Sequence, residues 1–71
     1  MEVYILEQTI INEVGDEMVI FNEVYENKED AINYLESIGF YLNKDECGYE
    51  NKDMSFMYYR IIDRKIIKRS V

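Results

Sequence analysis

The side chains that could do chemistry in this chain are carboxylates, one thiol and a few basic groups near the C-terminus. Cys47 is the only cysteine, and the chain has no histidine. A lone thiol cannot form an intramolecular disulfide, and without histidine it cannot build the usual zinc sites. Reactive thiols also need basic neighbours. We therefore interpret Cys47 as a spectator.

The acidic residues do not form a recognisable catalytic pattern. The chain has 15 of them, and none falls in a known metal-binding or acid/base spacing. Because histidine is missing, the commonest general base and the usual activator of serine and cysteine nucleophiles are missing too. The sequence predicts a protein that is not an enzyme and that has no catalytic residues, cofactor or metal.

Charge is distributed unevenly along the chain, whose net charge is −7. Up to Asp53 there are 14 acids against three lysines, a net charge of −11, and from Met54 onward five basic residues stand against Asp63, a net charge of +4. Such asymmetry indicates a charged partner or charge-paired self-association. The alternative is that the basic segment neutralises acidic neighbours within its own sheet.

The basic segment also suits a small anionic ligand. Arg60, Arg64 and Lys68 share one parity of a predicted strand, and Tyr58 or Tyr59 could stack on a base. One alternative function is therefore an oligomeric binder of a phosphorylated nucleotide. Direct binding to a nucleic acid is disfavoured because the net negative charge repels a polyanion.

One helix is predicted over about residues 28–38. Asn27 can accept a hydrogen bond from a free N–H of the first turn, where acidic side chains also favour the helix dipole. Ala31, Ile32, Leu35 and Ile38 recur at helical spacing, so one face is expected to be buried. After it, Gly39 can adopt a left-handed conformation that lets Phe40 fold back on Leu35.

The remaining apolar segments read as strands separated by turns. An antiparallel hairpin is expected around Gly15-Asp16, and a long loop is expected before the last strand, whose continuation beyond Asp63 could be helix or strand, with strand favoured. The predicted segments are strands at residues 3–11, 18–25, 40–42 and 54–62, a loop at 43–53, and a continuation at 63–69.

These segments predict an α+β fold in a single domain over residues 1–71. A small antiparallel sheet of three to four strands has one helix packed on one face. The first strand is apolar on both faces, as is typical of a central strand. One helix covers only one face, so the other face keeps exposed apolar groups that could contact another protein or a second copy. The last strand, Phe56 to Ile62, is expected to be an unpaired edge that could pair with its counterpart in a homodimer.

Several short segments resemble small uncharacterised accessory proteins of strand-strand-helix-strand type, encoded by bacteriophages and bacterial mobile elements. The resemblance covers roughly two thirds of the chain and rests on Val3-Tyr4-Ile5-Leu6, Val24-Tyr25, Asn27-Lys28-Glu29-Asp30-Ala31, Tyr34-Leu35 and Tyr58-Tyr59-Arg60-Ile61. The loop at residues 43–53 and the basic C-terminus depart from it. It brings no catalytic residues, and it implies a phage-type protein that binds host machinery.

The predicted function is therefore that of an acidic, non-enzymatic protein that binds and inhibits a host or anti-phage defence protein. The candidate partner-binding residues are Phe56, Tyr58, Tyr59, Arg60, Tyr49, Glu29, Asp30 and Glu36. An acidic mimic of nucleic acid is a further alternative, since carboxylates cluster around the helix. The chain has no apolar run of ~20 residues and no basic signal-peptide start, so we expect it in the cytoplasm of a bacterial host, not in a membrane.

Overall fold

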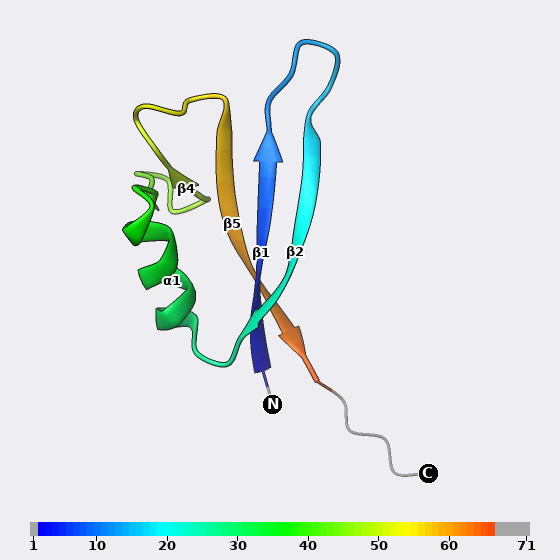
Figure 1. Ribbon diagram of the computed structural model, residues 1–71, viewed down its shortest axis with the longest axis vertical. Helices are drawn as coiled ribbons and strands as arrows, with labels where there is room; N and C mark the ends of the chain where they lie inside the picture. Colours follow the sequence, from blue (N-terminus) through cyan, green and yellow to red (C-terminus); the bar gives the residue numbers. More distant parts are fainter. Residues whose placement is uncertain (1, 67–71) are drawn as a thin grey trace.

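The computed structural model describes residues 2–66, whose arrangement is shown in Figure 1. In chain order the elements are β1 (Glu2–Ile10), β2 (Glu17–Tyr25), α1 (Lys28–Ser37), β3 (Tyr41–Leu42), β4 (Tyr49–Glu50) and β5 (Met57–Lys65). Within residues 2–66 the strands form a five-stranded antiparallel sheet in the order β2-β1-β5-β4-β3. The predicted α+β class is confirmed, with more strands than the three to four expected.

β1 lies inside the sheet, in agreement with the apolar side chains on both of its faces. Its register with β5 runs from Glu2 opposite Lys65 to Ile10 opposite Met57. Its register with β2 is interrupted by a bulge between Ile5 and Glu7, which bends a strand and increases its twist. Figure 1 shows that β2 and β5 cross β1 in opposite directions towards its N-terminal end.

The start of α1 confirms the predicted position but corrects the predicted cap. The side chain of Asn27 makes no capping hydrogen bond. Its backbone carbonyl instead accepts a hydrogen bond from the N–H of Asp30 at 3.1 Å. Glu29 and Asp30 lie in the first turn, where their charges favour the positive end of the helix dipole. Electrostatics and the backbone turn, not an amide cap, define this helix start.

The end of α1 has the geometry that the sequence predicts. Gly39 has φ +89°, and its N–H donates to the carbonyl of Glu36 at 3.0 Å. The N–H of Phe40 donates to the carbonyl of Leu35 at 2.8 Å, which completes a Schellman motif. Both Leu35 and Phe40 are buried. The helix end therefore turns the chain directly into the core.

The core lies between α1 and one face of the sheet, which we call the inner face. Six buried residues form it: Leu6, Ala31, Leu35, Phe40, Tyr49 and Tyr59. The ring of Tyr59 is central, since it makes edge-to-face contacts with Phe40 at 4.8 Å and with Phe21 at 5.8 Å between ring centroids. The core is small and strongly aromatic.

Three sequence predictions need correction in the second half of the chain. The predicted loop at residues 43–53 contains β4, because Tyr49 pairs with Tyr59 and Glu50 with Tyr58. The strand predicted over residues 54–62 begins at Met57 and continues as strand through Lys65; residues 67–69 lie outside the described part. The segment Phe56 to Ile62 is not an edge, since β5 lies between β1 and β4 and the sheet ends at β2 and β3.

Candidate functional site

The sheet face opposite α1, which we call the outer face, is the candidate site. The strand registers define its cross-strand rows. Val24, Ile5 and Ile62 form one row, Ile20, Glu7 and Arg60 form the next, and Met18, Thr9 and Tyr58 form a third that continues through Glu50 to Tyr41. At the N-terminal end of β1, Val3 lies opposite Arg64. The outer face is thus apolar with a charged centre.

β2 supplies three apolar side chains of the outer face that are more than half exposed. Met18 is 65% exposed, Val24 54% and Ile20 53%. No second layer covers them within residues 2–66, where the one helix packs on the inner face. Exposed apolar groups gathered on one face are typical of contact surfaces, whereas scattered ones are ordinary.

The centre of the outer face holds two buried polar residues of β1, Glu7 and Thr9. Oε1 of Glu7 lies 3.6 Å from Nη1 of Arg60, and Arg60 keeps more than half of its side chain exposed. Among the described residues neither Oε1 of Glu7 nor Oγ1 of Thr9 has a hydrogen-bond partner. The ion pair therefore compensates a carboxylate that its neighbours largely shield from water.

The charge asymmetry of the sequence is partly resolved by this register. Arg60 lies opposite Glu7, and Lys65 lies opposite Glu2, so basic residues of β5 face acids of β1. Arg64 faces Val3 and is exposed. Arg60 and Lys65 thus neutralise acids of their own sheet, whereas the β1 residue opposite Arg64 is apolar.

Two of the residues predicted to bind a partner are parts of the core. Tyr49 is 8% exposed and Tyr59 is 5% exposed. The hydroxyl of Tyr59 accepts a hydrogen bond from Nε2 of Gln8 at 2.8 Å. Burial raises the pKa of both phenols above the usual value, and the charge of Glu36 adds to the effect at Tyr49. Their side chains face α1 and are not available as a binding surface.

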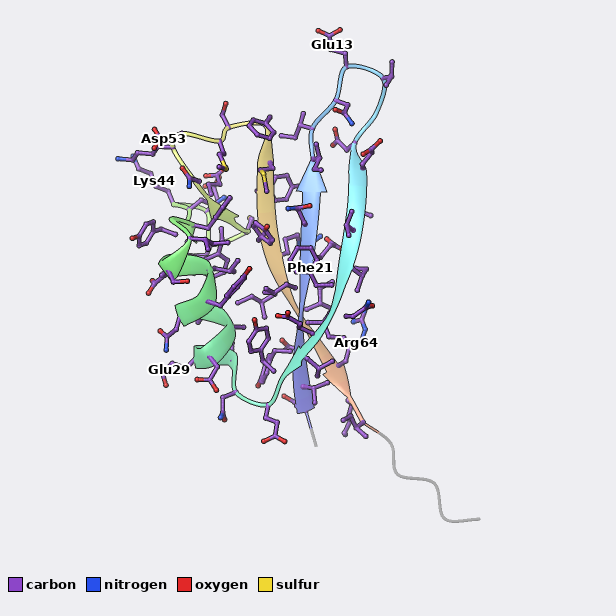
Figure 2. The ribbon with its side chains drawn as sticks, in the orientation of Figure 1. Glu13, Phe21, Glu29, Lys44, Asp53 and Arg64 are labelled. Atoms are coloured by element: carbon purple, nitrogen blue, oxygen red, sulfur yellow. The ribbon has the colours of Figure 1, made fainter. Side chains whose placement is uncertain are left out.

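The other predicted residues lie in two separate places. Tyr58 and Arg60 belong to the outer face, and Phe56 is exposed in the turn that leads into β5. The acids Glu29, Asp30 and Glu36 are exposed on α1, on the other side of the sheet. Figure 2 shows Glu29 on α1 and Arg64 on β5 at opposite sides of the molecule. The structure therefore does not join the aromatic and acidic candidates into one surface.

Met18, Ile20 and Val24 were not among the predicted binding residues. The sequence does show that these residues alternate along their strand, but the residues between them are largely apolar too. Alternation alone does not indicate which face the helix covers. The pairing of Met18 with Thr9, Ile20 with Glu7 and Val24 with Ile5 places all three on the uncovered face.

A cavity of about 780 Å³ lies where β4 ends beside β5. Its lining includes Lys28, Tyr58 and Arg60, which would suit a phosphate and a base, but it also includes Glu46 and Glu50. These carboxylates offset the positive charge, so the cavity does not favour the phosphorylated-nucleotide alternative. A second hollow of about 1030 Å³ is lined mainly by residues 41–45 and 50–55.

In residues 2–66, no group of three or more Asp, Glu, Cys or His side chains is arranged to hold a metal ion. The helix found in this range is not long and apolar enough to cross a membrane. Cys47 is exposed, and its thiol lies 3.3 Å from the carbonyl oxygen of Asp45.

Comparisons with known protein families, with curated proteins and with solved structures found no match to this chain. The resemblance to phage accessory proteins therefore stays a prediction. Residues 2–66 form a five-stranded antiparallel sheet with one helix, which is an α+β fold. A fold does not determine a function, so the residues of the outer face carry the functional inference.

Proposed function

We propose that this protein is a non-enzymatic binding module that inhibits a host or anti-phage defence protein by docking its outer face on it. The observation that carries the proposal is the exposure of Met18, Ile20 and Val24 on a sheet face without a covering layer in residues 2–66. The kind of partner follows from the resemblance to phage accessory proteins, and the docking surface follows from the geometry.

The chemistry of the outer face suits a protein partner. Burial of a whole Val, Ile or Met side chain contributes roughly 1.5–3 kcal/mol, and these three are about half exposed, so each can still contribute roughly 1 kcal/mol. Around them lie Tyr58 and Arg60, and Tyr, Arg and Met are enriched at protein interfaces. The apolar residues of β2 lie beside the charged pair of Glu7 and Arg60, so the surface offers a partner both apolar and charged contacts.

Ile20→Asp tests the proposal. The substitution places a charge among the exposed apolar side chains of β2, where a docked partner would have to desolvate it, so we expect at least a tenfold loss of partner binding and of inhibition. Binding is measured by capture of the partner from host lysate, and inhibition by plating of phage on cells that express the protein.

Val14→Asp is the matched control, since Val14 is 99% exposed in the hairpin turn outside the outer face. It should bind and inhibit like the unmodified protein. If Ile20→Asp inhibits as well as Val14→Asp does, the outer face is not the docking surface.

The acidic-mimic alternative predicts a different pattern. Reversal of Glu29, Asp30 and Glu36 to lysine would abolish inhibition if carboxylates on α1 occupied a groove built for phosphates. Under our proposal this variant keeps its activity, because the three residues lie on the helix and not on the outer face. Thermal denaturation of each variant shows whether it is folded.

A further inference from the structure

The sheet has two open strand edges. β5 pairs with β1 along all nine of its residues, but on its other side it pairs with β4 only at Tyr58 and Tyr59. The segment Arg60–Lys65 therefore has one side without a strand partner among residues 2–66. On the far side of β1, β2 is the last strand in the sheet order, so its outward side is open over the same described range. Open strand edges are templates for pairing with another chain.

The two edges carry opposite charge. The open segment of β5 holds Arg60, Arg64 and Lys65 against Asp63, whereas β2 holds Glu17 and Glu23 and no basic residue. Pairing β2 with β2, or β5 with β5, would bring like charges together, which is unfavourable on adjacent strands. Pairing β2 with β5 brings opposite charges together.

We propose that β2 of one copy adds to the open edge of β5 in a second copy, so that copies associate head to tail through a continuous sheet. Glu17 and Glu23 share one parity of β2, and Arg60 and Arg64 share one parity of β5. Glu17 pairs with Ile10 and lies on the inner-face parity, whereas both arginines lie on the outer face. An antiparallel contact in which the second copy is turned over brings the acids and the arginines to the same side of the joined sheet, within reach of one another.

The open segment of β5 has room for an added strand. β4 ends at Glu50, and the cavity of about 780 Å³ lies directly beside Arg60 and Ile61. Figure 1 shows the C-terminal, orange part of β5 leading away from α1, and Figure 2 shows Arg64 on the side away from the helix. Six residues of strand span about 20 Å, enough for a ladder of backbone hydrogen bonds.

The first half of β2, before the bulge, lacks the usual protection of an edge strand. Natural edges are commonly blocked by lysine, proline or inward-pointing charges. The stretch Met18–Phe21 in this half of β2 has none of these. Because the two contacting edges differ, the contact is heterologous and can repeat, which gives rings or longer assemblies. The outer face stays free in such an assembly, so this proposal does not depend on the proposed function.

A charge-swap experiment tests the association. The first variant, Glu17→Lys/Glu23→Lys, makes both edges basic, and the second, Arg64→Glu/Lys65→Glu, makes both edges acidic. Arg60 is left unchanged because it compensates Glu7. We expect the unmodified protein to show a mass that rises with concentration in sedimentation or light scattering, and each variant alone to stay at the monomer mass. Mixed in equal amounts, the two variants should associate again.

Three further measurements complete the test. Glu13→Lys/Glu36→Lys changes charge by the same amount as the first variant but away from both edges, and it should associate like the unmodified protein. Association should weaken as salt screens the charges, whose Debye length is about 8 Å at 0.15 M ionic strength. Amides of residues 60–65 should exchange more slowly at high concentration.

The proposal is overturned if the unmodified protein remains a monomer, or if both variants associate alone and gain nothing on mixing. It is also overturned by association that is insensitive to salt, since that result would indicate pairing through the apolar outer face. Circular dichroism identifies any variant that fails to fold; protection of residues 60–65 in the unmodified protein then decides the question.

Discussion

At the scale of single residues, the ion pair between Glu7 and Arg60 is the most consequential contact of the outer face. Arg60→Ala leaves a buried carboxylate oxygen without its compensating charge. Leaving a buried polar group unsatisfied costs about 1–3 kcal/mol, and we expect the lower end because Arg60 itself is largely exposed. Urea denaturation measures the loss.

The same pair can be tested for coupling. Glu7→Gln should remove most of the penalty of Arg60→Ala, because no buried charge then remains to be compensated. Arg64→Ala, on the same strand but opposite an apolar residue, should change stability by no more than about 0.5 kcal/mol. Equal losses for Arg60→Ala and Arg64→Ala would show that the ion pair contributes nothing.

Three fully or partly buried tyrosines predict loss of stability in alkali. Burial raises the pKa of Tyr25, Tyr49 and Tyr59 above the ordinary 10.0. As the pH rises past about 10, these phenols ionise first in the unfolded chain, which then binds fewer protons than the folded one. Stability is therefore full below this pH and falls as the pH rises through the folded-state pKa values. The measurement is the melting temperature between pH 8 and pH 12, which should fall as the pH rises.

Tyr59→Phe isolates the contribution of one phenol. At neutral pH it removes the hydrogen bond from Gln8 and should cost about 1 kcal/mol. In alkali the variant should lose less stability than the unmodified protein, because one raised pKa is gone. Tyr41→Phe, at an exposed position, is the control and should follow the unmodified protein. An identical alkaline loss in both variants would contradict the role given to Tyr59.

At the scale of elements, the end of α1 depends on Gly39. Its φ of +89° is in the left-handed region, and a Cβ there would lie 2.8 Å from Nδ2 of Asn51. A left-handed conformation costs a residue other than glycine about 1–2 kcal/mol, so Gly39→Ala should destabilise the protein by at least that amount. Gly15→Ala separates the two causes, because its φ of +137° carries a backbone cost as well, whereas a Cβ there meets nothing within 4 Å. Chemical denaturation should show the larger loss for Gly39→Ala.

The local elements could be predicted from sequence because their causes are local. The Schellman end at Gly39-Phe40, the alternation in β1 and the turn at Gly15 each depend on a few neighbouring residues. The side-chain cap predicted at Asn27 was wrong: its side chain makes no capping hydrogen bond, and its backbone carbonyl accepts from the N–H of Asp30. β4 was missed because a two-residue strand has no periodicity, and only its pairing with β5 makes it a strand.

The arrangement of the strands could not be predicted in the same way. The last strand was expected at an edge, yet β5 lies inside the sheet because β1 and β4 pair with its two sides. That choice depends on contacts between residues far apart in sequence. Tyr49 and Tyr59 were wrongly predicted to bind a partner for the same reason. Alternation along a strand identifies its two faces, but it does not show which face α1 covers.

At the scale of the whole molecule, the outer face and the open strand edges are separate surfaces, so one can be occupied while the other stays free. The outer face is apolar and stays free when strand edges pair, whereas the edges of β2 and β5 carry opposite charges. A chain with net charge −7 repels its own copies at long range, so association depends on bringing the basic edge close. Partner binding and self-association are therefore expected to respond differently to salt.

The register of β1 with β5 also determines when the protein can fold. A hairpin of β1 and β2 is marginally stable by itself, since two strands bury little apolar surface. β1 gains its second neighbour only when residues 57–65 are available, at the far end of the described chain. Closing so long a loop costs entropy before any contact compensates it, which slows folding. On the ribosome, one edge of β1 therefore stays unpaired until residues 57–65 have been synthesised.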